Sequence, residues 1–484
     1  MTPLPLRYPH RLFEALFLAA LAISAATMTY AESIPIAVDP RIEAASIVSR
    51  LAGLDGYSQP GVTAYDRAVK EWFAPYASHP AVSLLAKLNR KNQIGYDAPV
   101  ALALVLDPVT FQPRVPLDPR PSFLQESWTP PLAKQFAAAL ALFVKDSNFT
   151  GFMVKTAGMQ RNVEQALAKS LGGGVDLDWF RRQYNVPLGS RFTVAPALLS
   201  ARNSYGLHVT FPDGRMEVTL ALATPSVDDA SNLAYPDAAI MGLLVHELSH
   251  AFVNPWVDAN AKSLLPHAAK LYAIVRSSMQ SNAYGSPRIM LYESIVRGMA
   301  VRYAREHALS NVERYSIQDD RSKDFLWTDA LATRLAADPP LPFHAAGDRV
   351  IAFFTEWGAD ATARVQQVRI AIAAEQADRL KRGPQITRLV PANGDMSVDA
   401  TVDALEIQFD RPMQPGISIF GDVPEVVGKP AWNAEFTVLR VPVKMSPGRV
   451  YVMQLNSDGD GDFVSKEGQA LVPREWRFQV RGRK

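Results

Sequence analysis

The chain of 484 residues contains no cysteine. This absence excludes disulfide bonds, thiolate metal sites, cysteine nucleophiles and a lipid-modified N-terminal cysteine. Any bound metal must therefore use nitrogen and oxygen ligands, chiefly histidine and carboxylate. A chain of this length can bury enough apolar surface to fold without disulfides, and it is long enough for two or three domains.

The sequence also has little excess charge and no long internal apolar run. Its formal net charge is +2, a bias too small to favour binding of nucleic acid or of an anionic membrane. Near the start, Arg7 and Arg11 precede an apolar run, Leu12–Ala26, and Ala31 offers a small-residue cleavage site. Because a spanning helix needs ~20 apolar residues, we predict that residues 1–31 are a cleaved secretory signal rather than a retained anchor. We expect a secreted or periplasmic protein of the bacterial cell envelope, without stable membrane insertion after cleavage.

The apolar periodicity changes twice along the chain. Residues 32–190 mostly show helical spacing, and two strand-like runs, Leu207–Phe211 and Met216–Ala223, follow with turn residues between them. Helical patterns then resume, and beyond residue 383 six or seven short alternating runs indicate an all-β region. The sequence predicts an α+β protein with a mainly helical domain and a small antiparallel sheet over residues 32–383. A β-sandwich domain is expected over residues 384–484.

The segment His246-Glu247-Leu248-Ser249-His250 reads H-E-x-x-H. On a helix, the two histidines lie one turn apart on one face and can bind one Zn²⁺, while Glu247 lies beside the open metal position as a general base. The alternative for the two histidines is a buried pair bonded to the backbone. If zinc is bound, the alternative for Glu247 is a residue that only orients a metal ligand. We expect the helix to end at Asn254-Pro255, with Asn254 as its cap.

A catalytic zinc normally has three protein ligands and a water. No third histidine follows in the pattern H-E-x-x-H-x-x-G-x-x-H. Glu293, on a helix expected over Pro287–His307, is the best remaining candidate, and its alternative role is an i,i+4 pair with Arg297. Weaker candidates for the third ligand are Glu306, Glu313, Asp228 and Asp229.

Three further features carry open alternatives. The strand Met216–Ala223 is either an edge strand that pairs with an extended substrate or a plain structural strand. The loop Asn456–Glu467 has oxygen-bearing residues at EF-hand positions, but its flanks read as strands, which favours a solvated hairpin turn over a calcium loop. A group that stabilises the transition state is expected opposite the zinc, and the conceivable residues are Tyr284, Tyr292, Tyr303 and His344.

The segments Val245–Pro255 and Tyr292–Arg297 together resemble the gluzincin zinc metallopeptidases. They are more similar still to the DUF4932 family of secreted bacterial proteins, with its H-E-x-x-H-x-x-x-N-P run and a later Glu before I-V-R. This resemblance covers about Asn203–Ala304 and implies that His246, His250 and Glu293 bind zinc, with Glu247 as the base. Thermolysin-like members often have Asp where this chain has Arg297, and their gap before the ligand Glu is shorter. The residues around the ligands are therefore expected to differ.

The C-terminal region has a separate resemblance. Residues 389–395, Leu-Val-Pro-Ala-Asn-Gly-Asp, and residues 407–413, Ile-Gln-Phe-Asp-Arg-Pro-Met, are similar to bacterial Ig-like domains, which are usually spacers or adhesion modules. The whole chain is expected to be a secreted zinc-dependent metallopeptidase that hydrolyses a peptide or protein substrate. The alternative is a non-catalytic, zinc-containing binding or adhesion protein of the cell envelope. The sequence specifies neither the cleavage preference nor an oligomeric state.

Overall fold

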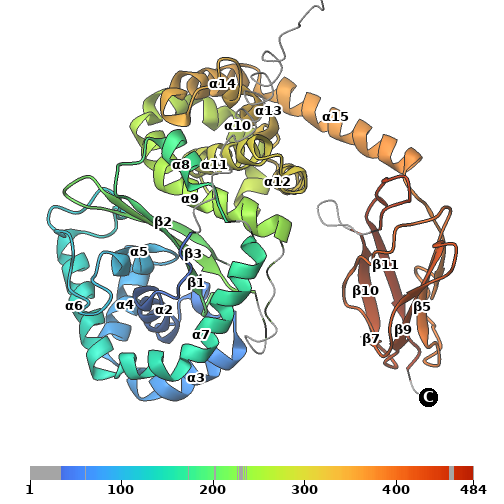
Figure 1. Cartoon of the computed structure of the whole chain (residues 1–484), viewed down its shortest axis with the longest axis horizontal. Coiled ribbons are helices and arrows are strands. Elements are labelled where there is room, and N and C mark those ends of the chain that lie inside the picture. Colours follow the sequence, from blue (N-terminus) through green and yellow to red (C-terminus); the bar gives the residue numbers. More distant parts are fainter. Residues whose placement is uncertain are drawn as a thin grey trace, which may run out of the picture.

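The computed structural model describes residues 34–59, 61–172, 174–200, 203–225, 227, 233, 235, 237–456 and 463–482. Helices dominate up to residue 382 and strands dominate after it, so the predicted α+β class is confirmed (Figure 1). The predicted signal segment, residues 1–31, lies outside the described residues. In the part of the chain that the structure describes, no helix is long and apolar enough to cross a membrane.

The first group of helices packs around one side of a three-stranded sheet (Figure 1). Two short helices, α5 and α8, are absent from the prediction. Almost every residue of α5 is buried, so its sequence shows no apolar periodicity to detect. The helices of this group are α2 (Pro40–Leu51), α3 (Thr63–Phe73), α4 (Pro80–Asn92), α5 (Ala98–Leu104), α6 (Pro130–Asp146) and α7 (Phe149–Leu171). Helix α8 (Leu177–Tyr184) follows them in the chain but lies beside α9 and α11, on the other side of the sheet (Figure 1).

The sheet consists of β1 (Arg191–Ala197), β2 (Tyr205–Thr210) and β3 (Met216–Ala223), in the order β1-β3-β2. The predicted hairpin is present, because β2 and β3 are antiparallel, but β1 runs parallel to β3. The small sheet expected to be antiparallel is therefore a mixed sheet, and β3 is its central strand rather than an edge. Its five consecutive buried residues are typical of a strand with neighbours on both sides.

The second group of helices lies on the other side of this sheet and continues toward the C-terminal region (Figure 1). α9 packs against α11, α12 and strand β2, which places it at the centre of the group. The sequence pattern did not reveal α12 and α14. The helices are α9 (Asp237–Ala259), α10 (Ala261–Ser281), α11 (Pro287–Glu306), α12 (Ser310–Ser322), α13 (Thr328–Leu335), α14 (Gly347–Ala359) and α15 (Ala361–Arg382).

Helix α9 does not end at Asn254-Pro255 as expected. It continues through Pro255 to Ala259. Proline removes one helical hydrogen bond and strains the preceding turn. Val253 and Val257 on either side are fully buried, and their packing outweighs that local cost. The additional turn keeps Asn254 inside the helix, where its side chain faces the preceding turn.

The C-terminal region has its own buried core, which lies between two antiparallel sheets. One sheet has the order β11-β10-β6 and the other β4-β5-β9-β7, with β8 paired to β9. The fully buried Trp476 and Leu405 come from different sheets and share this core. The strands are β4 (Ile386–Val390), β5 (Ala404–Phe409), β6 (Ile419–Gly421), β7 (Glu425–Val426), β8 (Ala431–Trp432), β9 (Val438–Lys444), β10 (Val450–Leu455) and β11 (Arg474–Gln479).

Asn456, the first residue of the conceivable calcium loop, is completely buried. Its Oδ1 accepts a hydrogen bond from the N–H of Phe463 at 3.2 Å, and its Nδ2 donates to the carbonyl of Leu471 at 2.7 Å. The oxygen that would occupy the first ligand position is therefore bonded within the hairpin. Residues 457–462 of this loop lie outside the described residues.

Glu43 in α2 gives the fold a pH-dependent element. Its side chain is buried, its Oε1 accepts the N–H of Leu198 just after β1, and burial raises its pKa to about 7 from 4.5. The folded chain thus holds this proton more tightly than the unfolded chain.

This difference in the pKa of Glu43 predicts a pH-dependent stability. We expect the free energy of unfolding to fall by about 3 kcal/mol as the pH rises from about 4.5 to about 7. The measurement is chemical denaturation between about pH 4 and pH 8. The fall in the free energy of unfolding with rising pH should be lost in Glu43→Gln and kept in Glu71→Gln, which changes an exposed residue. Equal slopes in all three proteins would contradict the assignment.

Candidate metal centre

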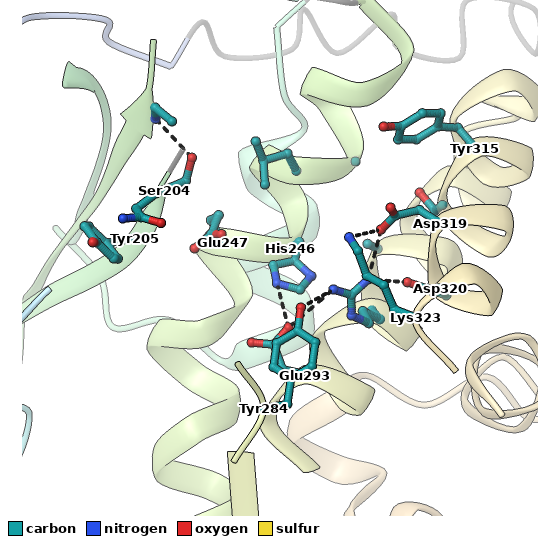
Figure 2. A pocket seen from close by; sticks show the side chains of 17 residues that line it. Ser204, Tyr205, His246, Glu247, Tyr284, Glu293, Tyr315, Asp319, Asp320 and Lys323 are labelled. Carbon is teal, nitrogen blue, oxygen red and sulfur yellow. Dashed lines mark hydrogen bonds and ion pairs between the residues drawn. The ribbon is translucent and has the colours of Figure 1, made fainter. Parts of the chain in front are cut away.

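Helices α9 and α11 bring the three predicted ligands together. The Nε2 atoms of His246 and His250 are 3.2 Å apart. One carboxylate oxygen of Glu293 lies 3.5 Å from His246 Nε2, and the other lies 3.5 Å from His250 Nε2. Figure 2 shows the His246 ring and the Glu293 carboxylate turned toward each other. Within the described part of the chain, these three residues are the group of His, Asp and Glu that could hold a metal ion.

The separations between these atoms suit a small tetrahedral cation. Ligands that bind zinc tetrahedrally at 2.0–2.1 Å lie about 3.3 Å from one another, close to the three distances given above. Burial, followed by the nearby His250, lowers the pKa of His246 well below its usual value. The His246 ring is therefore neutral near pH 7 and has a lone pair to donate. Two nitrogens and a carboxylate are a donor set that suits zinc.

Asn254 fixes the orientation of the second histidine. Its Oδ1 lies 3.0 Å from His250 Nδ1, one helical turn away. A carbonyl oxygen can only accept a hydrogen bond, so Nδ1 carries the proton and Nε2 presents its lone pair to the other ligands. Asn254 is thus a partner of His250 and not a helix cap, which corrects the sequence prediction. This contact requires α9 to continue past Pro255.

Glu247 lies on the side of α9 that faces the sheet. Its Oε2 accepts a hydrogen bond from the backbone N–H of Gly206 in β2 at 2.9 Å. Burial and the charge of Glu293 raise the pKa of Glu247 well above its usual value, although the bond from Gly206 opposes this shift. The carboxyl group is therefore anchored by a backbone donor from another element while it lines the same pocket as His246.

Gly206 permits an unusually close contact between β2 and α9. A Cβ atom at this position would lie 1.6 Å from the backbone oxygen of Glu247. We expect Gly206→Ala to lower the free energy of unfolding by at least about 1–3 kcal/mol, because the strand and the helix must separate. The measurement is chemical denaturation, with Gly158→Ala in α7 as the control, since a Cβ there would meet nothing within 4 Å beyond its chain neighbours and the adjacent backbone of its own helix. Equal stability of the two variants would refute this close contact.

Two of the candidate ligands, His246 and Glu293, line a pocket of about 590 Å³. One wall comes from Ser204 and Tyr205 at the start of β2, and the opposite wall comes from α12, which includes Tyr315 and Asp319 (Figure 2). Tyr284 also lines the pocket, and its hydroxyl accepts a hydrogen bond from Arg297 at 3.0 Å. An apolar helix pattern could not have revealed the α12 wall, because only two residues of α12 are buried.

The other sequence candidates lie elsewhere or have other partners. Glu306 bonds to Trp179 and Arg302, and Glu313 bonds to Arg305. The hydroxyl of Tyr292 donates to Asp258, that of Tyr303 accepts from the N–H of Asp176, and His344 contacts the carbonyl of Gln183. Among the four conceivable transition-state groups, Tyr284 is the one that lines the pocket. Asp228 and Asp229 lie outside the described residues.

Comparison with curated proteins and with solved structures gives only distant similarities. No curated protein matches the chain. CopC from Methylosinus trichosporium OB3b is 18% identical over 21% of this chain and 96% of that one, with a TM-score of 0.16. The surface layer protein SbsC, domains 1–6, is 11% identical over 83% of this chain and 46% of that one, with a TM-score of 0.15. This chain thus spans less than half of that SbsC structure, and TM-scores this low support no statement about fold.

A family model gives the informative match. Residues 127–337 match the family described as "Domain of unknown function (DUF4932)". The matched region contains α9, α11 and α12, and with them His246, Glu247, His250 and Glu293. It extends further in both directions than the resemblance at Asn203–Ala304. This match supports the predicted resemblance to the DUF4932 family over residues 127–337.

Proposed function

We propose that this chain is a secreted zinc-dependent metallopeptidase of the gluzincin type. The observation that carries the proposal is the cluster of His246, His250 and Glu293, whose ligand atoms all lie within 4.8 Å of one another. Glu247 lines the same pocket as two of them. Secretion is proposed from the predicted signal at residues 1–31, and an Ig-like role as a spacer or adhesion module is proposed for the C-terminal region.

In this proposal the chemistry is peptide-bond hydrolysis. Zinc, when bound by the three ligands, would polarise the substrate carbonyl and make water a better nucleophile. Glu247 takes a proton from the attacking water as the oxygen–carbon bond forms. It then gives that proton to the leaving nitrogen as the carbon–nitrogen bond breaks, which yields a carboxylate and an amine. Burial and the charge of Glu293 raise the pKa of Glu247 and so favour the protonated carboxyl, the form that donates the proton to the leaving nitrogen.

Tyr284 and strand β2 also have roles in this proposal. Arg297 has only donors, so the Tyr284 oxygen accepts from it and the Tyr284 proton remains free to stabilise negative charge on the substrate oxygen. Because β3 is central in its sheet, β2 replaces it as the strand that would pair with an extended substrate, and Ser204 and Tyr205 line the pocket at its start.

The proposal is tested with the purified full-length protein. We expect one zinc per chain by metal analysis and cleavage within a broad peptide library. A chelator should abolish the cleavage and added Zn²⁺ should restore it. Protein that holds one zinc per chain but cleaves no peptide would refute the catalytic proposal and favour the non-catalytic envelope protein.

A further inference from the structure

A buried guanidinium group lies directly behind the candidate metal ligands. Arg297 in α11 is 7% exposed. Its Nη1 donates to Asp320 Oδ1 at 2.5 Å and to Asp319 Oδ2 at 3.2 Å, both in α12. Its Nη2 donates to Tyr284 Oη at 3.0 Å and lies 3.6 Å from a Glu293 oxygen. One side chain therefore contacts a candidate ligand, a pocket tyrosine and the neighbouring helix.

The contacts with α12 fix this guanidinium in place. Asp320 is also buried, and the guanidinium carbon lies 4.6 Å from the centre of the Phe325 ring. A buried charge is costly unless a partner of opposite charge and hydrogen bonds compensate it. The planar, forked donor set of arginine meets Asp320 and Tyr284 at once, which a lysine ammonium group cannot do with the same geometry. The contacts therefore define one position for the group.

We propose that Arg297 is the positioning residue of the metal centre: it holds the Glu293 carboxylate toward the two histidines, and Asp320 holds Arg297. This inference rests on the proposed function for the identity of the metal. Glu293 has three rotatable side-chain bonds, and at 3.6 Å the guanidinium attracts one oxygen without a full hydrogen bond. The lone pairs of that oxygen stay available for a metal while its direction is set.

The same contact sets the direction of the Tyr284 hydroxyl. Arginine supplies donors only, so the tyrosine oxygen must act as the acceptor and its proton must point elsewhere. Groups that orient metal ligands typically change metal affinity about 10–100-fold when they are removed. Removal of Arg297 should therefore weaken zinc binding by this amount even though Arg297 is not itself a ligand.

The experiment measures the zinc dissociation constant of the full chain by competition with a chromophoric chelator, together with thermal unfolding. Arg297→Met alone leaves Asp320 buried without a partner, so the decisive variant combines Arg297→Met with Asp320→Leu, which removes both charges. We expect this double variant to unfold cooperatively and to bind zinc about 10–100-fold more weakly. Arg297→Lys keeps the charge but not the fork, and it should restore affinity only in part.

The control is Arg302→Met, which removes another buried arginine of α11, one that bonds to Glu306 and the carbonyl of Leu341. It should lower stability but leave zinc affinity unchanged. If the folded double variant binds zinc as tightly as the wild type, or if Arg302→Met weakens binding equally, Arg297 has no positioning role. A wild type without zinc affinity would overturn this inference together with the proposed function. Zinc binding without peptide cleavage would overturn the proposed function alone.

Discussion

Replacing Glu247 by glutamine is expected to lower kcat for peptide cleavage by about 10²–10⁴-fold, the usual contribution of a general acid–base group. Glutamine has nearly the same shape, and its oxygen can still accept the N–H of Gly206, but it cannot take a proton from water. The three candidate zinc ligands are untouched, so the variant should retain one zinc per chain. Because burial raises the pKa of Glu247, the neutral amide should not destabilise the folded chain.

This prediction is measured by steady-state kinetics and metal analysis on the same preparation. The control is Glu71→Gln, an exposed glutamate in α3, which should cleave like the wild type. A Glu247→Gln protein that contains zinc and cleaves peptide at the wild-type rate would exclude the proposed proton transfer. Loss of zinc from this variant would instead indicate that Glu247 belongs to the metal ligands.

Replacing Glu293 by glutamine should weaken zinc binding by about 100–1000-fold. The free energy of zinc binding to protein sites, roughly 10–16 kcal/mol over four ligands, corresponds to about 3 kcal/mol for each ligand. Glutamine keeps the length of the side chain but loses the negative charge that faces both histidines. Peptide cleavage should fall in parallel at low zinc concentration and recover in part when zinc is added in excess.

Glu306→Gln on the same helix is the matched control, because Glu306 was an alternative third ligand and instead bonds to Arg302 and Trp179. Its zinc affinity should equal that of the wild type, as measured by chelator competition. A result in which Glu306→Gln loses zinc and Glu293→Gln keeps it would reverse the assignment of the third ligand.

The helices, strands and candidate site residues that the sequence indicated depend mainly on local spacing. The four-residue separation of His246 and His250 places both on one face of any helix, and the apolar residues around them predict that helix. Glu293 was chosen as the candidate third ligand by exclusion, since the chain has no cysteine and no third histidine nearby, and α11 places it beside the two histidines. The β2–β3 hairpin followed from two apolar runs that flank turn residues, and the all-β C-terminal region followed from its repeated short alternation.

The failures have one physical cause, which is contact between segments distant in sequence. The pairing of β1 with β3 depends on a strand that enters from outside the hairpin, so the mixed sheet order was not predictable from the two runs. The proline rule ended α9 too early because the packing of Val253 and Val257 lay outside local information. Helix α12 is mostly polar, since one of its sides lines a pocket instead of a core.

By itself, the sequence determined which residues make up the candidate site: two histidines, a glutamate next to the first of them, and a further glutamate expected from elsewhere in the chain. The tertiary structure alone decided what surrounds them. Asn254 orients His250 only because α9 continues, and Gly206 bonds to Glu247 only because β2 lies against α9. Arg297 reaches Asp320 only because α11 and α12 pack together. Helical periodicity fixes the neighbours of a residue within one turn, whereas partners from other elements are set by the packing of the whole core.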